Sequence, residues 1–252
     1  MIVRDTQNAF VLTTQDDHAR LSGQIAQQLD GKWLADTARA TDVLLAVEEH
    51  DRAWLRMDET PIWDDLAEAP CDFLSFPLLP KLLLYTVGLD EIEAKSPYAA
   101  LLSSLHFCSF GDIRNSGEAD AAAFLAHEEL RRERIRAALG ELDERSVAHH
   151  FRLLQLCDEL SLYICFNRPG ASKQEEHPWY QGGFGTQMED GVTFRAAWID
   201  EERIALAPFP FAGRADVTVR QKHIDKSELR RGGLAQAFRS APWSKRRFAF
   251  VE

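Results

Sequence analysis

The sequence predicts an α+β fold that is mainly α, in which a helical bundle is followed by a small antiparallel β-sheet. Apolar residues recur at helical spacing through most of residues 14–170. From residue 182 onward, the pattern changes to short β-type runs separated by turn residues. Two more β-prone runs surround a polar turn within residues 1–13 and predict a hairpin, which is a candidate to join the sheet. The expected domains are therefore 1–13, 14–170 and 182–252.

Side chains that accept hydrogen bonds from free backbone N–H groups mark the expected helix starts. Thr14 or Asp16 is the expected cap of the first helix, and Thr41 or Asp42 that of the second. The helices are expected over approximately 15–29, 42–55, 81–87, 97–110, 119–139 and 144–167. The segments expected to form loops are 59–80, which is rich in proline, and 111–118. The β-type runs are 192–199, 203–208, 217–221 and 248–251.

Composition narrows the range of partners. The chain has 252 residues, 45% of them hydrophobic, which is enough for one large domain or for a domain with a small appendage. Its formal net charge of −11 argues against nucleic acid and against an anionic membrane as the main partner, because an acidic surface repels both. A small phosphorylated molecule stays open as a partner, since a bound cation inverts the local field.

The cysteines and the N-terminus bear on the cellular compartment. None of Cys71, Cys108, Cys157 and Cys165 forms a CxxC pair, and three of them lie in apolar helical stretches, which favours reduced thiols. The first residues lack the basic-then-apolar pattern of a signal peptide, and no apolar run reaches membrane-spanning length. A cytoplasmic protein is expected, and a homo-oligomer stays open.

Four polar residues occupy positions where the helical pattern calls for apolar ones. His18 shares a helix face with Leu21 and other apolar residues. His50 and Asp51 end an aliphatic helical run, and Asp158 falls between leucines on the last long helix. A buried carboxylate is costly unless it is compensated, and imidazole and carboxylate together suit a divalent metal ion such as Mn, Fe, Ni, Zn or Mg. The alternative for each residue alone is an ordinary hydrogen-bonded core residue.

The order of these four residues along the chain and the sequence around each of them support the interpretation as a metal site. Histidine, then His-Asp on the next helix, then aspartate on a late helix is the order of the HD-domain metal-dependent phosphohydrolase superfamily. The segments DHARLSGQIAQQL, VLLAVEEHDRAW and LLQLCDELSLYIC resemble its three ligand helices. The whole chain also resembles an uncharacterised bacterial family with the same QxDHAxLSG opening, for which no reaction is known.

The superfamily resemblance implies an HD-like helical bundle and a site in which His18, His50, Asp51 and Asp158 bind the metal ion. It also implies hydrolysis of a phosphomonoester or phosphodiester of a small molecule, with Asp51 both binding the ion and orienting a water molecule. One departure concerns the substrate contacts: the usual Ile-Gly-Lys after His-Asp is replaced by residues 52–54, Arg-Ala-Trp.

Further candidates lie between the His-Asp pair and Asp158. By position, His106 resembles the extra histidines with which superfamily members bind a second metal ion or a substrate phosphate, and it is the second expected catalytic residue. A core histidine bonded to a backbone carbonyl is an equal alternative. Glu128 is a weaker candidate for a base or a bridge between metals. A cation is needed to balance phosphate charge. The candidates are Arg52, Arg56 and Lys81.

Two alternative functions keep the same site. An HD-type di-iron oxygenase would need ligands for a second iron, and His106 alone does not supply enough of them. A non-catalytic module that binds a metal or a ligand for regulation is favoured if the coordination sphere is closed.

Overall fold

A computed structural model describes residues 1–34 and 38–252. It confirms an α+β fold that is mainly α. The α-helices of the described chain are α1 (Gln15–Ala26), α2 (Ala40–Glu49), α3 (Leu78–Glu93), α4 (Pro97–Ser109), α5 (Gly111–Arg114), α6 (Ala119–Leu139), α7 (Glu144–Phe166), α8 (Pro178–Gln181) and α9 (Lys226–Ser240). Short 3₁₀ helices are η1 (Gly31–Leu34), η2 (Arg52–Trp54) and η3 (Lys173–Glu175).

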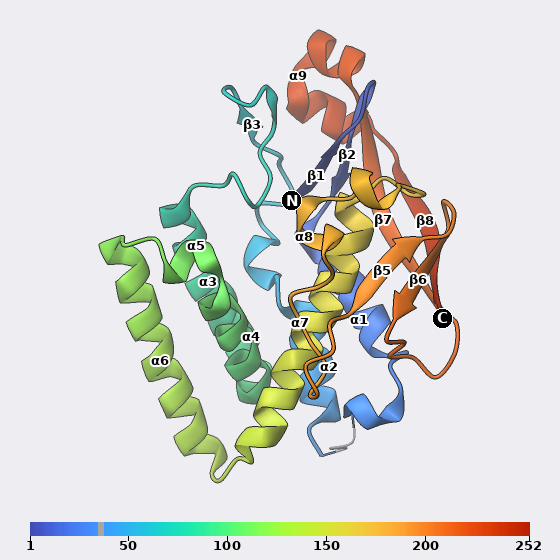
Figure 1. Ribbon diagram of the computed structural model, residues 1–252. Helices are drawn as coiled ribbons and strands as arrows, with labels where there is room; N and C mark the ends of the chain where they lie inside the picture. Colours follow the sequence, from blue (N-terminus) through green and yellow to red (C-terminus); the bar gives the residue numbers. More distant parts are fainter. Residues whose placement is uncertain (35–37) are drawn as a thin grey trace.

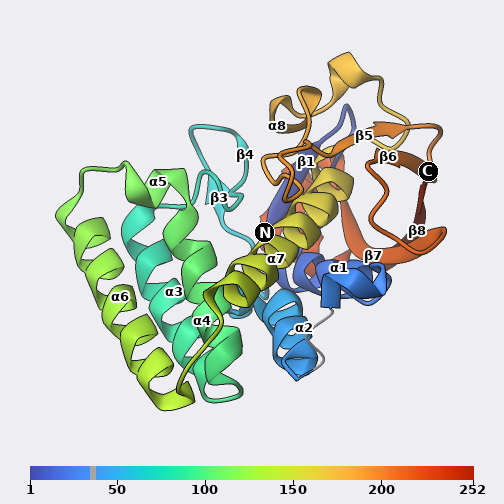
Figure 2. The same cartoon turned by 60° about the horizontal axis from the view of Figure 1, so that its bottom comes forward.

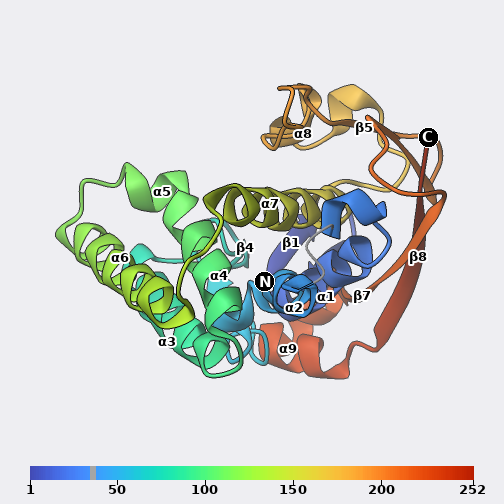
Figure 3. The ribbon, with the colours of Figure 1, turned by 90° about the horizontal axis from the view of Figure 1, so that it is seen from below.

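The strands are β1 (Ile2–Asp5), β2 (Ala9–Thr13), β3 (Trp63–Asp64), β4 (Ala69–Pro70), β5 (Arg195–Trp198), β6 (Arg203–Ala207), β7 (Ala215–Asp225) and β8 (Trp243–Val251). Helices α3, α4 and α6 lie on one side of the molecule and the six-stranded sheet on the other, with α1 and α7 between them (Figures 1, 2 and 3). The main hydrophobic core joins these two sides, since it contains residues of α1, α4 and α7 together with residues of β7 and β8. Within the described chain, no helix combines the length and the apolar character needed to cross a bilayer.

Several helix boundaries differ from the expectation. Thr14 caps α1 by accepting from the amide of Asp17, as expected, but the helix ends at Ala26. Helix α2 begins at Ala40 with Arg39 at the cap position, so the expected caps Thr41 and Asp42 are wrong. The carboxylate of Asp42 instead accepts from Ser96 at the start of α4.

Other elements differ from the expectation in length or in kind. Helix α3 is longer than the expected 81–87, because its exposed leucines obscure the helical pattern. Helix α5 and the small β3–β4 pair occupy segments expected to be loops. Helix α9 was not expected, since only Leu234, Ala237 and Phe238 of its residues are buried.

The N-terminal hairpin joins the C-terminal sheet, which has the strand order β1-β2-β7-β8-β6-β5. Strand β2 pairs antiparallel with the end of β7, where Ala9 opposes Asp225. The sheet is mixed and not wholly antiparallel, because β8 runs parallel to β6, with Arg203 opposite Ala249. Local patterns do not specify strand partners, and β8 inserts between β7 and β6 instead of extending an edge.

Gln24 of α1 and Gln28, just beyond the end of that helix, take the place of a strand along β7. Strand β2 covers only the last part of β7, from Lys222 onward. The side-chain amide of Gln24 donates to the carbonyl of Thr218 and accepts from its N–H, both at 2.9 Å. Gln28 pairs in the same way with Asp216, at 2.9 and 3.0 Å. These bonds satisfy the backbone groups of an open sheet edge and fix α1, which carries His18, against the sheet.

Replacing both Gln24 and Gln28 with alanine is expected to lower the free energy of unfolding by about 2 kcal/mol, because four part-buried backbone groups lose their partners. Urea unfolding measures the change. Gln27→Ala is the matched control, since Gln27 is exposed at the end of the same helix. A double variant no less stable than this control contradicts the strand-like role.

Candidate metal centre

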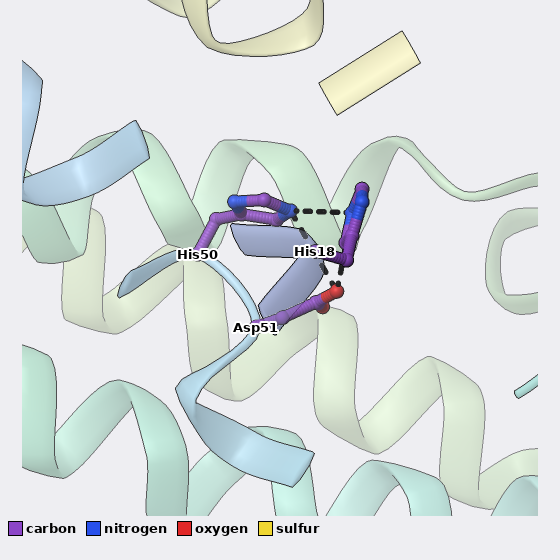
Figure 4. Close-up of side chains that lie close together, drawn as sticks. All are labelled: His18, His50 and Asp51. Carbon is purple, nitrogen blue, oxygen red and sulfur yellow. Dashed lines mark hydrogen bonds and ion pairs between the residues drawn. The ribbon is translucent and has the colours of Figure 1, made fainter. Parts of the chain in front are cut away.

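The four expected ligands meet in the interior of the molecule. His18 Nε2 lies 2.9 Å from Asp158 Oδ1 and 3.3 Å from His50 Nε2. Asp51 Oδ2 lies 3.6 Å from Nε2 of each of these histidines. His50 Nε2 is 3.4 Å from Asp158 Oδ1. Figure 4 shows the side chains of His18, His50 and Asp51 pointing toward one another.

These distances match those between ligands of a single ion. Atoms about 2.1 Å from one ion lie about 3.0 Å apart in octahedral geometry and about 3.4 Å apart in tetrahedral geometry. His18, His50 and Asp51 each offer an atom within one such group, and so do His50, His106 and Asp158. The buried His/Asp cluster is therefore able to hold a metal ion.

The end of α2 places His50 and Asp51 together. Residues consecutive in a continuous helix point about 100° apart, which would separate the two side chains. Here α2 ends at Glu49, and Asp51 leaves the helical conformation before η2 begins. Both side chains therefore reach the same ion position. His18 approaches it from the first turns of α1, and Asp158 from the middle of α7.

Outer hydrogen bonds orient the ligand atoms. His50 Nδ1–H donates to the carbonyl of Val47 at 2.8 Å, which leaves Nε2 with the lone pair that a metal requires. His18 Nδ1 lies 2.5 Å from Ser161 Oγ, which in turn donates to the carbonyl of Asp158. This assigns the Nδ1 proton to His18 and again frees Nε2. The amide of Gln15 donates to Asp51 Oδ2 at 3.0 Å.

Removing the hydroxyl of Ser161 is expected to weaken metal binding about 10- to 100-fold, because His18 loses the partner that sets its tautomer and ring orientation. Titration of Ser161→Ala with Mn²⁺ or Zn²⁺ gives the affinity. Ser103→Ala is the matched control: it removes a fully buried serine hydroxyl on α4 that has no hydrogen-bond partner in the described chain. Equal affinities of the two variants argue against this role.

The electrostatics of the site favour a cation. Burial acts to lower the pKa of His50, but the carboxylates of Asp51 and Asp158 outweigh it and raise that pKa to about 9. Burial raises the pKa of Asp51. Burial would also raise the pKa of Asp158, but hydrogen bonds with His18 and His50 hold that pKa below its usual range. A positive charge between these groups, from a proton or a metal ion, compensates the buried carboxylates.

His106 lies at the edge of the same cluster. Its Nε2 is 3.6 Å from Asp158 Oδ2, and its ring stands edge-on to that of His50. Burial lowers the pKa of His106 to about 3, so the ring is neutral at physiological pH. Its Nδ1 has no hydrogen-bond partner among the described residues, so the expected alternative of a ring held by a backbone carbonyl is not observed.

A cavity of about 540 Å³ opens onto the cluster. His18, Asp51, His106 and Asp158 contribute to its wall. Its volume falls within the range of small-molecule sites in proteins. The site is thus accessible to a ligand of moderate size from the side where Asp158 is exposed by 13%.

The cavity distinguishes among the candidate cations. Lys81, which is buried, lines it and forms an ion pair of 2.9 Å with Asp112 at its wall. Arg52 and Arg56 do not line it, and both pair with Glu91 instead. Of the three, Lys81 is the residue that lines the cavity.

Glu128 does not belong to the site. Its side chain is fully buried against Arg131, with Oε2 3.0 Å from the guanidinium Nε. Arg131 also pairs with Asp90 and Glu93 of α3, so the group ties α6 to α3. Neither Glu128 nor His127 lines the cavity, and neither belongs to the potential metal-ligand groups of the described chain.

Sequence reasoning missed the residues that support the ligands. Ser161 is one turn beyond Asp158 and faces the same way, which is a signal that helical spacing offers. Gln15 gives no such signal, because it directly follows the cap of its helix. Tyr180 and Gly185 line the cavity, so residues beyond the helical region complete it.

Comparison with known proteins gives a family but no activity. The model of a family described as "Protein of unknown function (DUF3891)" matches residues 1–226. No curated protein and no solved structure shows significant similarity to the chain.

Proposed function

The chain belongs to the DUF3891 family, whose description assigns no function, and we propose from its own residues that it is a metal-dependent phosphohydrolase acting on a phosphate ester of a small molecule. One observation carries the proposal. A cluster of two histidines and two aspartates, spaced like the ligands of one ion, lies at the wall of a cavity large enough for a substrate. Its ligand order is that of the HD-domain superfamily, to which we propose that the fold is related.

A divalent ion held there would supply Lewis acidity to a phosphoryl oxygen and would lower the pKa of bound water. His18, His50, Asp51 and Asp158 are the residues that would hold it. Asp51 has Oδ2 fixed by Gln15, so its carboxylate is positioned to accept a hydrogen bond from the attacking water.

Two further residues face the substrate in this proposal. Lys81 contributes positive charge at the cavity wall, where it would balance phosphoryl charge. Neutral His106 faces Asp158 from α4 and has an unused Nδ1 for a hydrogen bond. Both are proposed to orient the ester so that water attacks at phosphorus.

The same geometry bears on the two alternative functions. A second ion would share His50 and Asp158 with the first. Among the described residues, only His106 would bind the second ion alone, so a single ion is favoured over a di-iron centre. A purely structural metal site is typically closed, whereas this cluster opens onto a cavity, which favours catalysis over a non-catalytic module.

The test starts with metal content. Purified protein offered Mn²⁺, Fe²⁺, Ni²⁺, Zn²⁺ or Mg²⁺ is expected to retain about one ion per chain, measured by mass spectrometry, and then to hydrolyse phosphate esters. The variant carrying His50→Ala and Asp51→Ala should lose both. His127→Ala, which changes an exposed histidine on α6, is the control. A wild-type protein that binds no metal, or that binds one but hydrolyses no ester, contradicts the proposal.

A further inference from the structure

The cavity beside the cluster has mainly apolar walls. Aromatic rings come from four separate segments: Phe73 before α3, Tyr85 on α3, Phe110 at the end of α4, and Trp179 and Tyr180 on α8. Leu74 and Leu162 also line the cavity. An aromatic lining of this kind binds flat or apolar groups through buried area and edge-to-face contacts.

The charges of the wall are unsuited to a substrate with many phosphates. Lys81 is the one lysine or arginine among the described residues that line the cavity, and Asp112 already pairs with it. Asp51, Asp158 and Glu159 add further acidic groups. Asp51 and Asp158 offset the charge of a bound divalent ion and Asp112 offsets that of Lys81, so the wall has no surplus positive charge for a polyphosphate.

Three residues that line the cavity carry polar atoms without partners. These atoms are Gln15 Oε1, His106 Nδ1 and the hydroxyl of Tyr180, each buried and without a hydrogen-bond partner in the described chain. Buried polar groups ordinarily have partners, so these atoms indicate that a ligand supplies them. Gln15 and His106 contact Asp51 and Asp158 of the cluster, so at least part of this unmet hydrogen bonding lies beside the proposed ion position.

We propose that the substrate is a monophosphate ester with a compact apolar body, preferably aromatic, and not a sugar phosphate or a nucleoside polyphosphate. The phosphoryl group lies at the His/Asp cluster, and the body lies among Phe73, Phe110 and Trp179. This inference rests on the proposed phosphohydrolase function, which it narrows to one substrate class.

Comparing two esters whose leaving groups have similar acidity separates recognition of the apolar body of the substrate from its chemical reactivity. Metal-loaded protein is expected to hydrolyse 2-phenylethyl phosphate with a kcat/KM at least about tenfold above that for glycerol 3-phosphate, because only the first buries an apolar ring. ATP should be the poorest of the three. Hydrolysis of glycerol 3-phosphate or ATP at an equal or higher kcat/KM overturns the substrate class and leaves the phosphohydrolase function standing.

A binding experiment keeps the two proposals distinguishable if no ester is hydrolysed. By calorimetry, 2-phenylethylphosphonate is expected to bind the metal-loaded protein at least about tenfold more tightly than methylphosphonate. That preference without any hydrolysis supports the cavity assignment and rejects the hydrolase. Equal affinities reject the cavity assignment.

Two matched tryptophan variants test where the apolar body of the substrate binds. Trp179→Ala, at the cavity wall, should raise KM for 2-phenylethyl phosphate about threefold or more while kcat and metal content change little. Trp243→Ala removes a similarly exposed tryptophan on β8, outside the cavity, and should change none of these. An equal response of the two variants contradicts the placement of the body beside Trp179.

Discussion

Asp158→Asn is expected to weaken metal binding by more than about 100-fold and to reduce ester hydrolysis to the level of the buffer. Asp158 lies in contact with three histidines: Oδ1 faces His18 and His50, and Oδ2 faces His106. Asparagine keeps the size of the side chain but removes the negative charge that a divalent ion needs in a buried site. Loss of a hydrogen bond outside the ligand set typically costs 10- to 100-fold in affinity, so loss of a ligand charge should cost more.

Titration with Mn²⁺ or Zn²⁺ measures this affinity, and urea unfolding shows whether the metal-free variant is folded. Asp112→Asn is the matched control, because it neutralises another carboxylate of the same cavity that pairs with Lys81 and not with the histidines. Its metal affinity should stay within about threefold of the wild type, as expected for a charge partly exposed to solvent. Similar losses in the two variants would mean that net cavity charge, and not direct ligation, holds the ion.

The four residues that form the His/Asp cluster could be predicted to come together because burial of a polar group interrupts the apolar pattern of a helix. His18 and Asp158 each interrupt an apolar face, and the cost of desolvation makes such interruptions informative. The cavity leaves no comparable mark. It forms where Phe73, Tyr85, Phe110 and Trp179, far apart along the chain, come together, so only the tertiary structure shows it.

The fold was predictable to a similar degree. Helices α6 and α7 were expected close to their observed bounds, because Gly140 marks the end of α6 and Pro169 and Gly170 follow the end of α7. Helix α3 was shortened in the expectation because Leu79, Leu83 and Val87 are exposed on the face opposite its buried residues. The position of β8 between β7 and β6 depends on contacts over long sequence distances, which local residue patterns do not encode.

Gly88→Ala is expected to destabilise the protein by about 3 kcal/mol and to weaken metal binding as well. Gly88 lies on the face of α3 that packs against η2, and a Cβ atom there would be 2.6 Å from Ala53 Cα and 2.7 Å from Ala53 N. Those atoms belong to the backbone, so no side-chain rotation relieves the overlap, and α3 and η2 must separate. Because Ala53 follows Asp51 by two residues, that separation displaces a metal ligand.

The intrinsic preference of helices for alanine over glycine acts in the opposite direction, by about 1 kcal/mol, so a net loss of stability requires the steric term to dominate. Gly23→Ala on α1 separates the two effects, since its added Cβ would be 3.3 Å from the Cβ of Glu48, whose side chain is exposed. Urea unfolding should show a change within about 1 kcal/mol for that control, and metal titration should show little loss. If Gly88→Ala is as stable as the control and binds metal equally well, the close approach of α3 to η2 does not position Asp51, and the hydrogen bond from Gln15 remains as the contact that orients its carboxylate.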